Sequence, residues 1–249
     1  MSWLAFFDDA AIFPPGNAPL DAAVARHIEL SDSSDGALLG PFICPASRLD
    51  ELCHLLGHRN LTISLIANTD HTADVLTVVA GLRNLTLASV ELPLGLAPIP
   101  VDGATLAIER RWDDDWQIPD GAVLKLRCGG SQESDVPGTD AMASAIQHCV
   151  STATPFKLTA GLHQAVRGID PHTGFTHHGF LNIAVGVQRA LSGHDVLTTL
   201  ASTDGPALAT EFLAGPPVRD LFRSIGTCDT MVPIRDLHTL QLIDDRQPA

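Results

Sequence analysis

One stretch, residues 122–163, limits the folds open to this chain more than any other part of the sequence. Its two ends, 122–130 and 155–163, are short apolar runs typical of β-strands, and the segment 134–152 between them has the pattern of a helix. A strand, a helix and a strand in this order form a βαβ unit, in which the two strands are parallel neighbours. The sequence therefore predicts a parallel sheet.

Each of these two strands carries one lysine, and the chain has no other lysine. Lys125 and Lys157 are 32 residues apart, which places them at matching heights near the carboxyl ends of adjacent strands. Side chains alternate along a strand, so Lys125 shares a face with Arg127, and Lys157 shares a face with Thr159. Two neighbouring ammonium groups repel and burial disfavours charge, so we expect both lysine pKa values to be lowered, towards a neutral nucleophile.

The rest of the chain continues the alternation of strands and helices. Further strands are predicted at 4–7, 36–44, 61–67, 85–92, 104–109 and 221–228, and further helices at 19–30, 47–56, 69–82, 180–191, 196–213 and 234–242. The connections before and after the strand at 104–109 are short, so the helices around the fourth and fifth strands are expected to be reduced or missing. We therefore predict an α/β fold, an eight-stranded parallel β/α (TIM-type) barrel that forms a single domain over 1–249.

Composition excludes several classes of function. The formal net charge is −14 and no basic run is present, which argues against nucleic acid as a partner. No apolar run approaches the roughly 18 residues of a membrane span, and the first residues lack a signal-peptide pattern. The five cysteines have no regular spacing, which favours reduced thiols and a cytoplasmic protein. We expect a small-molecule substrate, no membrane partner and no cofactor, and the sequence is compatible with a homo-oligomer.

Polar residues gather at the predicted carboxyl ends of the strands, where β/α barrels carry their chemistry. They are Asp8, Asp9, Cys44, Asn68, Glu91, Glu109, Lys125, Arg127, Lys157, Thr159, His163 and Cys228. In one reading the two lysines pair with Glu109 and Glu91 in a buried ionic layer. In the other reading they are catalytic, because buried charges are rare and cluster at functional sites. The cysteines read better as small buried apolar residues than as a thiolate site.

Glycines near these ends suggest a place for a phosphate group. Backbone N–H groups of glycine turns often hold phosphate in such barrels, and two arginines lie near enough in sequence to assist. The alternative is that the glycines only permit turns with positive φ. The candidate substrate-binding residues are Asp8, Arg127, Gly129, Gly130, Thr159, Gly161, Arg167 and Gly226.

The loop 162–179 is rich in histidine. It contains His163, Arg167, His172, His177 and His178. Adjacent histidines diverge on any regular element, so the spacing does not favour a metal site, and we predict that no metal is bound. The length of the loop fits a lid that carries one acid or base histidine.

The lysine pair resembles the deoxyribose-phosphate aldolase family of class I aldolases, which are β/α barrels with lysines on the sixth and seventh strands. In that family the sixth-strand lysine, in a Lys-Thr-Ser-Thr-Gly motif, forms a Schiff base, and the seventh-strand lysine, followed by Gly-Gly, lowers its pKa. The resemblance implies that Lys125 is the nucleophile and Lys157 its partner, with Gly129 and Gly161 in turns that face a phosphate. This chain departs from the motif at Arg127 and Cys128, and at Leu162-His163. The paired motifs also resemble a group of uncharacterised bacterial proteins.

The sequence thus predicts a Schiff-base lyase for a small carbonyl compound, phosphorylated or not. Lys125 would attack the carbonyl carbon, and Glu109, Glu91 or His163 would transfer protons. Two alternatives stay open. One is a metal-dependent hydrolase that uses Asp8, His163, Glu109 or the loop histidines, and the other is a non-catalytic binding barrel in which the lysines are ion-paired.

Overall fold

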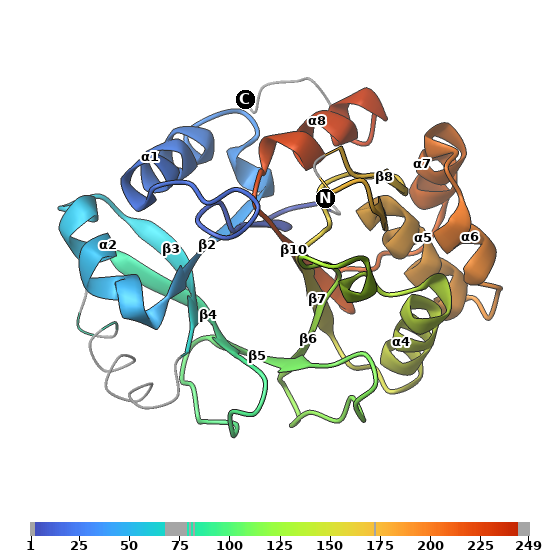
Figure 1. Cartoon of the computed structure of the whole chain (residues 1–249), viewed down its shortest axis with the longest axis horizontal. Helices are drawn as coiled ribbons and strands as arrows, with labels where there is room; N and C mark the ends of the chain where they lie inside the picture. Colours follow the sequence, from blue (N-terminus) through green and yellow to red (C-terminus); the bar gives the residue numbers. More distant parts are fainter. Residues whose placement is uncertain (1–2, 68–78, 80, 82, 172, 244–249) are drawn as a thin grey trace.

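The computed structural model describes residues 3–67, 79, 81, 83–171 and 173–243, and it shows a closed barrel of eight parallel strands (Figure 1). The barrel order is β1-β10-β7-β6-β5-β4-β3-β2, and the β2 edge closes on β1. The barrel strands are β1 (Phe7–Asp9), β2 (Leu39–Pro45), β3 (Leu61–Ile66), β4 (Leu85–Leu92), β5 (Thr105–Arg110), β6 (Val123–Arg127), β7 (Phe156–Thr159) and β10 (Phe222–Thr227). The predicted TIM-type barrel is confirmed.

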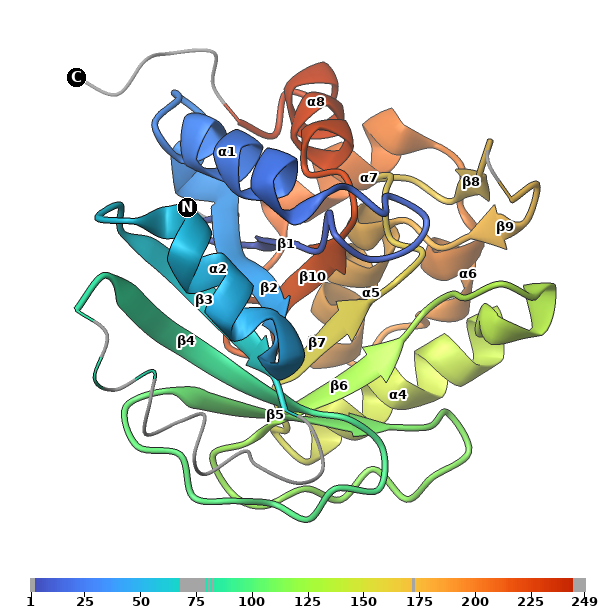
Figure 2. The same cartoon turned by 60° about the vertical axis from the view of Figure 1, so that its left-hand side comes forward.

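Helices surround the barrel unevenly, as Figures 1 and 2 show. They are α1 (Leu20–Ser31), α2 (Leu49–Leu56), α4 (Thr139–Ser151), α5 (Phe180–Leu191), α6 (Leu197–Ala201), α7 (Gly205–Ala214) and α8 (Met231–Thr239), with short 3₁₀ turns at Gly36–Leu38, Ala46–Arg48 and Glu133–Asp135. Residues 93–104 and 111–122, which flank β5, contain no helix, as predicted. The helix predicted at 69–82 lies almost wholly outside the described residues. Among the described helices, none combines the length and the apolar character needed to cross a bilayer.

Some predicted boundaries shift by a few residues, such as the last helix, predicted at 234–242 and found at Met231–Thr239. Three predicted segments differ more clearly from the structure. The first strand, predicted at 4–7, is Phe7–Asp9, because Ala5 has a φ of +46° that breaks the extended chain before it. The helical stretch predicted at 196–213 is two helices, α6 and α7, and the second begins where Asp204 accepts a hydrogen bond from the amide of Ala207. The loop after β7 contains a small antiparallel hairpin, β8 (Gly168–Ile169) and β9 (Thr176–His177).

The alternation along β6 and β7 explains how two lysines enter an apolar fold. Leu124, Leu126, Phe156 and Leu158 are buried in the core that also contains residues of α4 and α5. The side chains between them point the other way, into the barrel, because successive residues of a strand face opposite sides. Apolar packing against the helices therefore directs both lysines inward.

Candidate functional site

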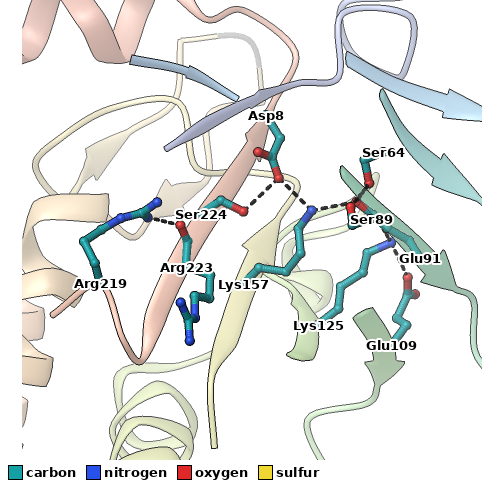
Figure 3. Close-up of polar contacts among 10 residues, drawn as sticks. All are labelled: Asp8, Ser64, Ser89, Glu91, Glu109, Lys125, Lys157, Arg219, Arg223 and Ser224. Atoms are coloured by element: carbon teal, nitrogen blue, oxygen red, sulfur yellow. Dashed lines mark hydrogen bonds and ion pairs between the residues drawn. The ribbon is translucent and has the colours of Figure 1, made fainter. Parts of the chain in front are cut away.

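Five buried charged side chains form a continuous chain of ion pairs across the inside of the barrel, here called the ion layer: Asp8, Glu91, Glu109, Lys125 and Lys157 (Figure 3). The Lys125 Nζ atom lies 2.9 Å from Glu109 Oε2 and 2.8 Å from Glu91 Oε2. The Lys157 Nζ atom lies 2.6 Å from Glu91 Oε1 and 2.7 Å from Asp8 Oδ2. Glu91 is thus the central member, with one oxygen for each ammonium group.

The registers of the strands produce this order. Lys125 pairs in register with Lys157 on one side and with Glu109 on the other. Ser224 of β10 pairs with Lys157, and β10 separates β7 from β1, which carries Asp8. The predicted matching heights of the two lysines are therefore confirmed.

Three hydroxyl groups complete the ion layer. Ser64 Oγ donates to Glu91 Oε1 at 2.8 Å and lies 2.6 Å from Ser89 Oγ. Ser224 Oγ donates to Asp8 Oδ2 at 2.8 Å. Buried carboxylates need several donors to remain ionised, and these serines supply them. Sequence reasoning missed all three, because a serine in an apolar strand carries no distinctive signal until its partner is known.

The electrostatics of the ion layer differ from the expectation for Lys157. Burial alone would lower the pKa of Lys157, but the charges and hydrogen bonds of Asp8 and Glu91 outweigh it and raise that pKa above its ordinary value. The predicted lowering is therefore wrong for this lysine, because the prediction counted the second amine and not the two carboxylates that contact Lys157. Burial likewise opposes the ionisation of Glu91, yet the two lysines hold its pKa well below the usual range.

Asp8 is the weakly compensated end of the ion layer. Burial raises the pKa of Asp8, and the attraction of Lys157 and the hydrogen bond from Ser224 only partly offset this effect. The reason is that Lys157 shares its single charge between Asp8 and Glu91. Asp8 therefore differs from Glu91, whose pKa the two lysines lower.

Arg219 lies beyond Asp8, at the start of β10 (Figure 3). Its guanidinium donates to the backbone carbonyls of Leu4, Phe222 and Arg223 and stands 4.9 Å from the centre of the Phe6 ring. Burial lowers the pKa of Arg219 to about 10, although the negative charge of Asp8 acts in the opposite direction. Arg219 thus places a cation just before the start of β10, and sequence reasoning did not find this role.

A cavity of about 490 Å³ opens above the ion layer, at the carboxyl ends of the strands. Its lining residues include six catalytic and binding candidates from the sequence besides Lys125 and Glu91: Arg127, Gly130, Thr159, Gly161, His163 and Gly226. Lys157, Asp8, Glu109, Gly129 and Arg167 are not among its lining residues. Of the two lysines, Lys125 is therefore the one that lines this cavity.

Close packing requires glycine in the turns that follow β6 and β7. Gly161 has a φ of +71°, and a Cβ atom there would lie 2.7 Å from His177 Nδ1 and 2.8 Å from the Cys128 carbonyl oxygen. A Cβ atom on Gly129 would lie 3.1 Å from the Gly161 Cα atom. The two turns thus pack tightly against each other, which explains both glycines without a bound phosphate.

His177 lines the cavity and was not selected as a site residue from the sequence. Its Nδ1 atom lies 2.7 Å from the Gly161 carbonyl oxygen, which can only accept, so Nδ1 donates. In the neutral imidazole, Nε2 is then the proton acceptor, and it lies 3.4 Å from Thr173 Oγ1. Sequence reasoning missed this role, because His177 contacts Gly161 only when the loop after β7 is folded.

The other loop residues serve mainly to hold the loop. The Arg167 guanidinium donates to His178 Nδ1 at 3.4 Å, and its amide donates to Asn182 Oδ1 at 2.8 Å. His178 Nε2 donates to the carbonyl oxygen of Pro137 at 2.8 Å. His163, in contrast, lines the cavity with its Nδ1 atom 3.1 Å from Thr227 Oγ1. His172 and Asn68 lie outside the described residues.

Neither a metal centre nor a thiolate site emerges from the described side chains. Among these residues, no group of three or more His, Cys, Asp or Glu side chains is arranged to hold a metal ion. Burial raises the pKa of Cys44 to about 12, and it also raises the pKa of Cys128. Cys228 is half-buried and lines the cavity, with Sγ 3.7 Å from His163 Nδ1, but burial raises the pKa of this thiol too.

The fold and site therefore define a TIM-type barrel with a buried ion layer beneath a cavity at the carboxyl ends of its strands. No family model, curated protein or solved structure matches this chain.

Proposed function

We propose that this protein is a class I, Schiff-base lyase, similar to an aldolase, that acts on a small carbonyl compound through Lys125. The observation that supports the proposal most strongly is the position of Lys125. Lys125 is buried among charged groups, yet it lines a cavity of about 490 Å³ at the end of the barrel where such enzymes carry their chemistry. Lys157 is not among the lining residues, so Lys125 is the lysine that meets a substrate.

The neighbours of Lys125 suit the proton transfers of such a reaction. In the ion layer Lys125 donates to Glu91 and Glu109, so an attack on a carbonyl requires one proton to leave first. Glu91 is the poorer acceptor, because the two lysines hold its pKa well below the usual range. Glu109, in contrast, is ion-paired with Lys125 and not with Lys157. Glu109 is also more exposed to solvent than Glu91, at 8% against 1% of its surface. Glu109 therefore takes the proton.

The covalent steps keep the charge of the ion layer. The neutral amine forms a bond with the carbonyl carbon to give a carbinolamine, and Glu109 returns its proton to the carbinolamine hydroxyl group. Water then leaves, and the product is an iminium with one positive charge at the former ammonium position. This charge remains between Glu91 and Glu109. Cleavage of the neighbouring carbon–carbon bond places its electron pair in the iminium, and a base in the cavity takes the hydroxyl proton of the leaving fragment. His163 and His177 both line the cavity and can supply that base.

The test is reductive trapping. Incubation with small aldehydes or ketones, phosphorylated and unphosphorylated, and borohydride should add one ligand mass to Lys125, located by peptide mapping. Lys125→Arg should abolish the adduct, because a guanidinium stays protonated and is no nucleophile at neutral pH. Only two lysines are present, so the α-amino group is the one further amine to exclude.

An adduct on Lys157 would keep the chemistry and reverse the two roles. The absence of any adduct across the panel would reject the lyase and favour the second candidate, a non-catalytic binding barrel. That candidate has its own support, because both amines are fully ion-paired in the ion layer.

A further inference from the structure

The described wall of the cavity is divided into an apolar arc and a polar arc. The apolar arc follows the ends of three neighbouring strands, β1, β2 and β3, and consists of Ala10, Phe13, Pro14, Pro15, Ile43 and Ile66. The polar arc follows β6, β7 and the loop after β7, and contains Arg127, Ser131, Thr159, His163, Asp170, Thr173 and His177. Lys125 and Glu91 form the charged floor between the arcs.

The two arcs line one cavity and meet at Gly226. A Cβ atom at this position would lie 2.8 Å from Thr159 Oγ1 and 3.3 Å from Ile43 Cδ1. Thr159 belongs to the polar arc and Ile43 to the apolar arc, so the two come together at Gly226. A side chain at position 226 would therefore collide with both arcs.

Such a wall selects against a uniformly hydroxylated ligand. Hydroxyl groups placed against Ile43 and Ile66 would lose their hydrogen bonds to water and find no partner on the described apolar arc. An alkyl chain in the same place would gain from leaving water. A polar group on the other side of the carbonyl would reach the donors of the polar arc, including the Arg127 guanidinium.

We infer that the substrate is an amphiphilic carbonyl compound, with an alkyl or aryl group on one side of the carbonyl and a polar group on the other. This inference rests on the proposed function, because it takes Lys125 as the point of attachment. The apolar substituent lies along the ends of β1 to β3, and the polar substituent faces β6, β7 and the loop that carries His177.

The experiment measures borohydride trapping of Lys125 across a series of ketones. The amphiphilic probes are hydroxyacetone, 1-hydroxybutan-2-one and 1-hydroxyhexan-2-one, and the fully polar probes are dihydroxyacetone and erythrulose. The ketone concentration that gives half-maximal labelling should fall about fourfold for each added methylene, the factor expected for full burial of that group. The fully polar probes should require at least about tenfold more ketone than 1-hydroxyhexan-2-one.

Two variants locate the effect. Ile66→Ser should flatten the dependence on chain length, and Leu94→Ser, at an exposed position that does not line the cavity, should leave it unchanged. Phe13→Ser, in the loop after β1, gives a second test if Ile66→Ser fails to fold. Labelling of Lys125 that is equal for all five ketones would overturn the inference and leave the lyase standing. The absence of labelling by every ketone would overturn both.

Discussion

Removal of the Lys157 amine tests how much of the stability of the barrel depends on charge compensation in the ion layer. Lys157→Met keeps the length of the side chain and leaves two carboxylates, Asp8 and Glu91, without their shared cation. Lys157 makes hydrogen bonds of 2.7 Å and 2.6 Å to them. Hydrogen bonds to charged groups contribute about 1.5–3 kcal/mol each. Loss of one partner from a buried ion pair costs about 3–5 kcal/mol.

We therefore expect Lys157→Met to lower the free energy of unfolding by about 3–5 kcal/mol near neutral pH. In a domain of this size the midpoint of thermal unfolding should fall by about 6–20 °C. Urea unfolding followed by circular dichroism measures the free energy, and a scan of temperature measures the midpoint. Arg189→Met is the control, because Arg189 is about a third exposed and its pair with Glu211 should matter much less.

The pH dependence separates charge from packing. The pKa of Asp8 is already raised by burial, and the loss of Lys157 raises it further. A group with a raised pKa takes up its proton as the pH falls, so the cost of Lys157→Met should be smaller at about pH 5 than at about pH 8. The double variant Asp8→Asn, Lys157→Met should also be more stable than Lys157→Met alone. A cost that is the same at every pH, with no rescue by Asp8→Asn, would refute the electrostatic account.

Three further predictions follow from single sites. Gly40→Ala should lower the free energy of unfolding by about 1–3 kcal/mol in urea titrations, because the Cβ atom of the new alanine would lie 2.2 Å from Asp8 Oδ1. Unchanged stability would contradict this prediction and show that the Asp8 side chain can move. Burial lowers the pKa of His178 from 6.5 to about 4, so its contribution to the free energy of unfolding is complete above about pH 6.5 and is lost as the pH falls towards 4. His178→Asn should therefore flatten the dependence of the free energy of unfolding on pH in this window, and an unchanged slope would contradict this. Only Cys53 and Cys228 are not buried, so an aromatic disulfide reagent should titrate two thiols in the folded protein and all five after unfolding; rapid reaction of a third thiol would be contrary evidence.

The sequence alone determined the barrel and the pairing of its two lysines. Both depend on local information, since strands and helices follow from apolar periodicity over a few residues. One helix between two strands requires them to be parallel neighbours. Lys125 and Lys157 therefore stand in register, as predicted, and α5 and β4 have the predicted bounds.

The sequence offers Glu91 and Glu109 as partners of the two lysines, and only the tertiary structure adds Asp8 and the serines around them. Asp8 is 149 residues from Lys157, and Glu91 is 66 residues from it. The sequence predicts Asp8 after the end of the first strand, whereas the structure places it inside β1, where a buried charge is unfavourable unless it has a partner. That partner is supplied only when the barrel places β10 between β1 and β7, so that Lys157 of β7 reaches Asp8 across β10. Charge compensation is thus a long-range property, and it reversed the predicted direction of the Lys157 pKa, which periodicity along the chain could not show.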